Sequence, residues 1–246
     1  SGTDLDIAVS TTVSASVDQE GAITLPARKL VEIVRELPSS SIRFTASGEQ
    51  RVTLECGKSK FKLLGLPREE FPAFPTVSFA GGWTVAAKEL HKLIGHVAFA
   101  ASTEESRPIL NGVLWELRPD KMRMVATNGH RLARISLPVA LEVEKRTDCI
   151  VPTKALNQVL RLVGEASEEG VQVKLAEDHV VFRCGETTLF TRLIEGPFPR
   201  YQDVIPKEND KKVVIRRGAL IDALRRVSLL SDNLTRQVRV TLRRDV

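Results

Sequence analysis

The chain contains a long internal repeat, which limits its possible folds more than any other feature of the sequence. The stretch from Leu25 to Phe74 is echoed by the stretch from Val151 to Tyr201. The landmarks keep a nearly constant separation: Pro26 and Pro152 are 126 residues apart (152 − 26), the matching cysteines 128 and the matching Phe-Pro pairs 127. This period is too long for a solenoid, so it predicts tandem domains related by pseudo-symmetry.

Four segments show helical periodicity, with apolar residues three and four positions apart. Their apolar sets are Leu30, Ile33, Val34 and Leu37; Leu90, Leu93, Ile94, Val97 and Ala101; Leu156, Val159, Leu160 and Val163; and Leu220, Ala223, Leu224, Val227 and Leu230. The second and fourth segments also align, because Leu90 and Leu220 are 130 residues apart (220 − 90). We therefore expect two repeated pairs of helices.

Between the helical segments, apolar residues alternate with polar ones, as in Val113, Trp115 and Leu117. This alternation is typical of half-buried antiparallel strands. Each repeated half-unit reads as strand, helix, strand, strand, strand. The sequence therefore predicts an α+β fold of tandem pseudo-symmetric domains, each built from two β-α-β-β-β half-units.

Measured with this repeat, the chain divides into three parts. Residues 81–207 hold two successive half-units and are expected to form one complete domain. Residues 1–80 are expected to be the second half of a domain, because Thr3-Asp4 falls 124 residues before the matching Thr127-Asn128 (127 − 3). Residues 208–246 are expected to begin a third domain with a strand, a helix and a further strand. The last strand is expected at Val238, Val240 and Leu242.

The bulk composition indicates an ordered globular protein, with 42% hydrophobic and 27% charged residues. No apolar run approaches the roughly 18 to 20 residues that span a bilayer, and no signal peptide is recognisable, so we expect a cytoplasmic protein with no membrane partner. The three cysteines form an odd set without a CxxC motif, which favours reduced thiols.

The common catalytic motifs are missing from the sequence: there is no glycine-rich phosphate loop, no HExxH, no nucleophile elbow and no paired Cys/His spacing. His91 and His96 are five positions apart, whereas two metal ligands on one helical face need a spacing of four. We therefore expect no catalytic residue, no metal and no cofactor. One alternative is a nucleic-acid-modifying enzyme with a scattered active site and a basic DNA-binding surface.

Positive charge recurs on the polar faces of the predicted helices, in a chain of net charge +5. For any single helix, a solvated mixed-charge face is the simpler interpretation. Recurrence in pseudo-symmetric copies instead favours a surface that follows a phosphate backbone without sequence preference and with strong salt dependence. The residues expected to face DNA are Arg28, Lys29, Lys88, Lys92, Lys154, Arg161, Arg225 and Arg226.

Several separated motifs resemble one known family. They are Gly2-Thr3-Asp4-Leu5, Arg107 to Val113 (RPILNGV), Thr127 to Ala133 (TNGHRLA), Glu195 to Tyr201 (EGPFPRY) and Val204-Ile-Pro206. In order and spacing they resemble the bacterial sliding clamp, the beta subunit of the replicative DNA polymerase III holoenzyme. The resemblance covers essentially the whole chain.

This resemblance implies a head-to-tail homodimer of three-domain subunits that closes into a ring. Helices would line a DNA channel and antiparallel sheets would form the outer wall. Such a processivity factor is not an enzyme. It encircles duplex DNA, slides along it and tethers the replicative polymerase during DNA replication.

The resemblance also implies a hydrophobic cleft that binds short linear motifs of the polymerase subunit, the clamp loader and repair proteins. Carried over by position, its residues are Arg107, Leu110, Thr127, Gly129, His130, Arg131, Leu132, Pro199 and Val204. A simpler interpretation is that Gly129 only turns the chain and the two leucines are ordinary core. Asn128 stands where the family often has an acid and Asp203 where it often has a base, so ligand preference is expected to differ.

Overall fold

The computed structural model describes residues 1–48, 50–73, 77–139, 141, 146–165, 170–231 and 237–242 of the chain. The chain forms two compact units, Ser1–Pro199 and Arg200–Val246, and each is described by itself. Phe74, which ends the first copy of the repeat, lies outside the described residues.

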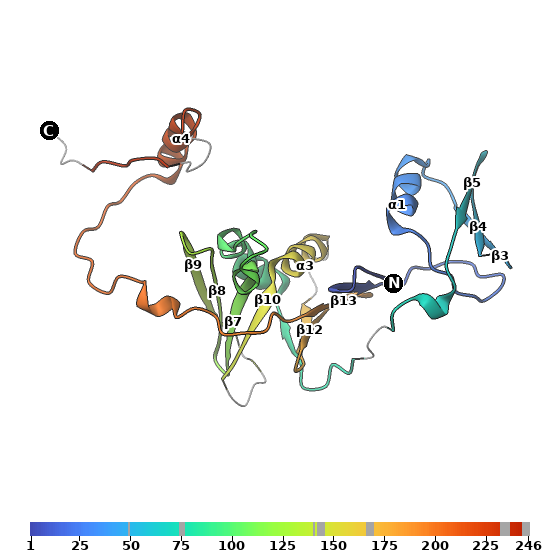
Figure 1. The fold of residues 1–246 in the computed structure, drawn as a ribbon, viewed down its shortest axis with the longest axis horizontal. Coiled ribbons are helices and arrows are strands. Elements are labelled where there is room, and N and C mark those ends of the chain that lie inside the picture. The colour runs from blue at the N-terminus through green and yellow to red at the C-terminus, as the bar shows by residue number, and fades with distance from the viewer. Residues whose placement is uncertain are drawn as a thin grey trace. The chain divides into compact units, whose positions relative to one another are not determined.

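The first unit combines helices with antiparallel sheets (Figure 1). Its described helices are α1 (Ala27–Glu36), α2 (Ala87–Gly95) and α3 (Thr153–Glu165). One sheet has the order β1 (Gly2–Thr3), β2 (Ile7–Ser10), β13 (Thr187–Arg192), β12 (His179–Cys184), β11 (Val171–Leu175) and β6 (Trp83–Val85). A second has the order β10 (Thr147–Pro152), β7 (Gly112–Arg118), β8 (Lys121–Thr127) and β9 (Leu132–Pro138). A third is β3 (Arg43–Ser47), β4 (Arg51–Cys56) and β5 (Ser59–Leu64). The α+β prediction is confirmed.

The repeat seen in the sequence is a repeat of structure. The series α1-β3-β4-β5 matches α3-β11-β12-β13, and a proline immediately precedes both helices, where its missing N–H costs nothing. The last hairpin of each copy turns through a glycine at positive φ, Gly57 at 56° and Gly185 at 53°. In both copies the cysteine before this glycine pairs with the residue three positions further along.

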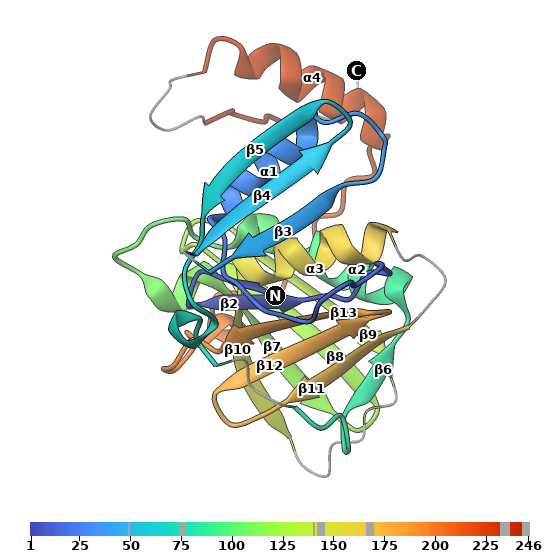
Figure 2. The ribbon, with the colours of Figure 1, turned by 90° about the vertical axis from the view of Figure 1, so that its right-hand side faces the viewer.

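The main core lies beneath α2 and α3. The two helices contact each other, α2 packs on β8 and β9, and α3 packs on β10 and β12, so together they cover strands of two sheets (Figure 2). Leu90, Leu93 and Leu156 are completely buried there. Burying each such side chain contributes on the order of 1.5–3 kcal/mol. Trp115 of β7 meets Phe182 of β12 edge to face, with ring centroids 5.8 Å apart, and so joins the two sheets.

The second predicted helix is shorter than its apolar pattern. Helix α2 ends at Gly95, and a 3₁₀ turn, η2 (Ala98–Ala100), follows it. The carbonyl oxygen of Lys92 accepts the backbone N–H of His96 at 3.2 Å and also lies 2.7 Å from the Nδ1 of the same residue, so His96 closes the end of the helix. Ala101 is buried as predicted, but beyond the helix.

One sheet runs through the predicted boundary between the first and second domains. Strand β2, near the start of the chain, pairs antiparallel with β13, with Val9 opposite Leu189. This pairing covers an edge of β13 that would otherwise expose its backbone groups. The domain limits 1–80, 81–207 and 208–246 stay a prediction.

The second unit contains η4 (Tyr201–Asp203) and α4 (Arg217–Ser228). Helix α4 appears where the apolar pattern predicted one, although its residues Leu220, Leu224 and Val227 are exposed. The strands expected before and after this helix, the second of them at residues 238–242, are wrong: within residues 200–231 and 237–242 no strand is formed. A strand needs a neighbour for its N–H and C=O groups, and no described segment of this unit pairs with those residues.

Candidate functional site

The solvent side of α2 and α3 carries four of the basic residues expected to face DNA. Lys88 and Lys92 are one helical turn apart on α2, Lys154 and Arg161 are two turns apart on α3, and all four are exposed. Because the two helices lie side by side, we call these four residues the helix face. Among the described residues, no carboxylate lies within 4.0 Å of Lys88, Lys92 or Arg161. These cations are available to a phosphate.

Lys154 differs from the other members of the helix face, because its Nζ lies 2.6 Å from a carboxylate oxygen of Asp4. Among the remaining residues predicted to face DNA, Lys29 on α1 is paired with Glu32 at 2.9 Å. Arg28 on α1 and Arg225 and Arg226 on α4 are exposed. That these four residues outside α2 and α3 face the same DNA stays a prediction.

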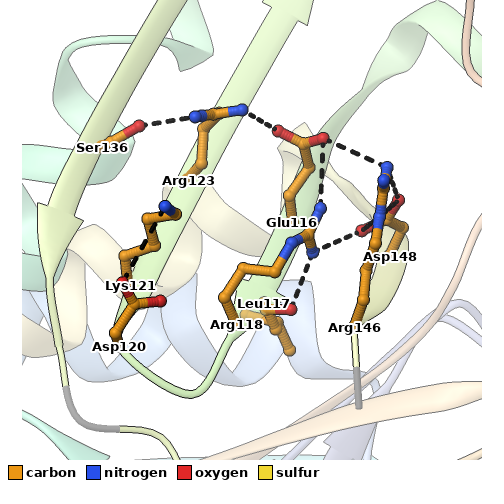
Figure 3. A network of polar contacts seen from close by, with 9 residues as sticks. All are labelled: Glu116, Leu117, Arg118, Asp120, Lys121, Arg123, Ser136, Arg146 and Asp148. Atoms are coloured by element: carbon orange, nitrogen blue, oxygen red, sulfur yellow. Dashed lines mark hydrogen bonds and ion pairs between the residues drawn. The ribbon is translucent and has the colours of Figure 1, made fainter.

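A second group of basic residues lies on the opposite side of the four-stranded sheet (Figure 3). Side chains alternate along β7, so the burial of its neighbours Trp115 and Leu117 in the core puts Glu116 on the outer face. Its carboxylate receives a hydrogen bond of 2.9 Å from Arg123 and lies 3.6 Å from Arg118. Glu116 is only 3% exposed.

Two more residues complete this network. Arg146 lies 3.5 Å from Glu116 and 2.7 Å from Asp148, and Asp148 also accepts a hydrogen bond of 3.0 Å from Arg118. Burial acts to raise the pKa of Asp148, but hydrogen bonds from Arg146 and Arg118 lower it below its ordinary value. We call Glu116, Arg118, Arg123, Arg146 and Asp148 the sheet face. Its arginines already have carboxylate partners.

The central part of the predicted peptide site is one tight turn between β8 and β9. The Thr127 hydroxyl donates to the carbonyl of Arg131 at 2.8 Å and accepts the N–H of Gly129 at 3.1 Å. The side-chain oxygen of Asn128 accepts the N–H groups of His130 and Arg131, both at 3.0 Å. Gly129 has a φ of 90°, which residues with a Cβ rarely adopt. His130 and Arg131 are exposed at the tip.

The same turn occurs near the start of the chain, at the Thr3-Asp4 pair that aligns with Thr127-Asn128 in the sequence. The Thr3 hydroxyl donates to the carbonyl of Ile7 at 2.9 Å and accepts the N–H of Leu5 at 3.0 Å. One Asp4 oxygen accepts the N–H groups of Asp6 and Ile7, at 3.2 and 2.9 Å. Leu5 has a φ of 80°, although it is not glycine, and is 74% exposed. The hydrogen bonds therefore define this turn in both copies.

Other predicted peptide-site residues surround the second turn. Leu132 pairs with Thr127 across β8 and β9, so the two residues flank the turn. A Cβ placed on Gly129 would lie 3.5 Å from a guanidinium nitrogen of Arg107, so the structure brings these two residues together. Leu110 is half-buried, and its N–H donates to the carbonyl of Arg107 at 2.9 Å.

The last two predicted residues lie further along the chain. Pro199 is exposed at the end of the first unit, and Val204, in the second unit, is 70% exposed. Their place in one cleft with the turn stays a prediction. A hollow of about 870 Å³ lies elsewhere, lined by residues 17, 20–23, 46–48, 50 and 67–69, and none of the predicted site residues is among them.

Two observations concern the chemistry that the described residues can support. No group of three or more His, Cys, Asp or Glu among them is placed to hold a metal ion. Burial raises the pKa of Cys149 to about 12, and the nearby Asp148 carboxylate acts in the same direction, so this thiol is protonated and unreactive near neutral pH. None of the described helices is both long and apolar enough to cross a membrane.

Comparison with known families accounts for nearly the whole chain. Residues 1–75 match the N-terminal domain of the DNA polymerase III beta subunit, residues 84–200 its central domain and residues 202–246 its C-terminal domain. The chain belongs to the family of bacterial DNA polymerase III beta subunits. The resemblance noted in the sequence is thereby confirmed.

Individual beta subunits agree with this assignment. The beta sliding clamp of Pseudomonas aeruginosa is 35% identical over 242 residues, which is 98% of this chain and 66% of the relative. The clamp of Chlamydia muridarum is 31% identical, over 96% of this chain and 64% of the relative. The chain thus spans slightly less than two thirds of the length of these relatives.

Solved beta subunits share the fold. The structure of the Pseudomonas aeruginosa subunit has a TM-score of 0.86 and 34% identity, covering 95% of this chain and 64% of that one. The sliding clamp of Bartonella birtlesii, solved bound to griselimycin, has a TM-score of 0.88 and 35% identity, again over 95% and 64%. Membership of the family therefore rests on sequence and on fold.

Proposed function

We propose that the protein is a DNA sliding clamp, a ring-shaped homodimeric processivity factor that encircles duplex DNA in the bacterial cytoplasm without catalysing a reaction. The observation that most supports this proposal is the match to all three beta-subunit domains in chain order. Lys88, Lys92 and Arg161 of the helix face add a physical reason, because exposed cations without carboxylate partners among the described residues bind phosphates without reading bases. Tethering the replicative polymerase to such a ring makes its dissociation from DNA rare.

The test separates encirclement from ordinary binding. The full-length protein is loaded onto nicked circular DNA by a clamp loader, and its retention is followed after a restriction enzyme linearises half of the sample. A ring slides off the free ends, so we expect retention on circles and loss from linear DNA. Equal retention on both forms contradicts the proposal, because it indicates binding through contacts alone.

The second part of the proposal is a peptide-binding cleft for the polymerase, the clamp loader and repair proteins. The proposed cleft consists of a central turn, two residues beside it and two further walls: Thr127, Gly129, His130, Arg131 and Leu132, then Arg107 and Leu110, then Pro199 and Val204. The positions of Arg107 and Gly129 support it, since a ligand there meets an exposed backbone turn next to a guanidinium group. The half-buried leucines supply apolar contact.

The repeat of the turn provides a matched control for this site. Leu132→Lys and Leu110→Lys are each expected to weaken binding of a clamp-loader peptide at least about 10-fold, because a charged group replaces apolar contact. Leu5→Lys changes an exposed leucine in the first copy of the turn and is expected to leave affinity unchanged. Circular dichroism and thermal unfolding check that the variants fold. Equal affinities for all variants contradict the assignment.

A further inference from the structure

The ion pair between Asp4 and Lys154 distinguishes Lys154 from the other cations of the helix face. One oxygen of Asp4 lies 2.6 Å from Nζ of Lys154, while the other accepts the N–H groups of Asp6 and Ile7 within the turn. The carboxylate is thus fixed by its own backbone before it meets the lysine. Fixing one partner in advance lowers the entropy lost when an exposed ion pair forms.

The position of Lys154 near the start of α3 makes the Asp4 carboxylate favourable for a second reason, the helix dipole. Lys154 is the second residue of α3, where the positive end of the helix dipole disfavours a cation. The first turn of α3 contains no acidic residue of its own. Asp4, brought from the start of the chain by the pairing of β2 with β13, supplies the missing negative charge.

Comparison of the two turns shows that the turn itself does not need this charge. Asn128 accepts the same two backbone hydrogen bonds with a neutral amide oxygen. An aspartate at position 4 therefore adds a negative charge that the local backbone does not require. The hydrogen bond to Lys154, followed by those from the turn, holds the pKa of Asp4 below its usual range, and the same pair raises the pKa of Lys154. Both groups stay charged at neutral pH.

We propose that Asp4 weakens the binding of DNA to the helix face. Its carboxylate competes with DNA phosphate for Lys154 and removes about one phosphate contact from the surface. The inference rests on the proposed DNA-encircling function. An exposed ion pair contributes only about 0.2–1 kcal/mol to stability, but the Asp4 carboxylate is held beside the lysine by its own turn and therefore competes with a phosphate at all times. A clamp that must slide benefits, because each phosphate contact fewer lowers the barrier to moving along the duplex.

The first test compares Asp4→Asn with the unchanged full-length protein in equilibrium binding to duplex DNA over a range of salt concentrations. Release of Lys154 adds one phosphate contact, so the slope of log K against log salt becomes steeper by about 0.9 and affinity at about 0.1 M salt rises roughly 5- to 10-fold. Adding Lys154→Gln to Asp4→Asn removes the gain. Asp120→Asn removes an equal charge from the exposed hairpin between β7 and β8 and is the control for net charge.

A second test needs no change in the turn. Lys154→Gln alone is expected to alter the salt slope little, because Asp4 already occupies the lysine, whereas Arg161→Gln reduces the slope by about 0.9. An unaltered salt slope in Asp4→Asn, or equal losses of slope from Lys154→Gln and Arg161→Gln, overturns the proposed role of Asp4. Neither result contradicts the proposed sliding-clamp function. If Arg161→Gln and Lys92→Glu also leave the salt slope unchanged, the proposal that the helix face contacts DNA is wrong.

Discussion

The helix face and the sheet face carry similar numbers of basic side chains. One lies on the solvent side of α2 and α3 and the other on the outer side of the four-stranded sheet, and their surroundings differ. On the helix face, Lys88, Lys92 and Arg161 have no carboxylate within 4.0 Å among the described residues. On the sheet face, Glu116 lies among three arginines and is almost completely buried (Figure 3). The arginines of the sheet face hold strands together, whereas three of the four cations of the helix face are left for a partner. Net charge alone does not distinguish the two roles.

The largest effect is expected from removing the central charge of the sheet face. Glu116→Gln should lower the free energy of unfolding by about 2–3 kcal/mol, because loss of the buried carboxylate deprives the surrounding arginines of their shared partner. Denaturant unfolding measures it. Asp120→Asn is the control: Asp120 is exposed and 3.9 Å from Lys121, so its loss should cost less than about 0.5 kcal/mol. Equal losses of unfolding free energy in the two variants would contradict the structural role assigned to the sheet face.

DNA binding should show the opposite preference. Lys92→Glu is expected to weaken duplex binding by the full-length protein about 10-fold and to flatten its salt slope by about 0.9, because a phosphate contact is lost. Arg134→Glu makes the same change of charge on the outer side of β9, where Arg134 is exposed, and should leave the slope unchanged. Salt titrations of both variants decide the matter, and equal slopes would mean that the helix face has no special role.

Acid should weaken the sheet face selectively. The folded pKa of Asp148 lies below its ordinary value, so its contribution is present above the unfolded pKa of about 3.9 and is lost as pH falls through the folded pKa. Asp148→Asn should therefore cost about 1 kcal/mol near neutral pH, with the difference from the unchanged protein vanishing as pH falls below about 3.9 and through the folded pKa of Asp148. Thermal unfolding across this range tests it. A constant difference would contradict the assigned ion pairs.

The smallest effect is expected from neutralising an unpaired cation. Lys88→Gln should change the free energy of unfolding by less than about 0.5 kcal/mol, because its exposed ammonium has no carboxylate partner among the described residues. Chemical denaturation is the measurement. A loss above about 1 kcal/mol would show that the helix face also has a structural role.

Much of the site followed from the sequence because it depends on local rules. The helical period placed Leu90, Leu93 and Leu156 in the core, and this put the lysines of the same helices in solvent. The match of Thr3-Asp4 to Thr127-Asn128 served only as a landmark of the repeat, and the structure shows that the two pairs form turns with the same hydrogen bonds. Sequence reasoning missed the pairing of Asp4 with Lys154, which are 150 residues apart (154 − 4). No local pattern joins them.

The sequence by itself determined the repeat, the order of helices and strands around α2 and α3, and the family, because periodicity, turn residues and motif spacing act over short distances. Only the tertiary structure decided which cations are neutralised. Pairing of β2 with β13 brings Asp4 to α3, and the alignment of β7, β8 and β10 gathers Glu116, Arg123 and Asp148. Electrostatic interactions depend on distance in space and on burial, and the fold sets both.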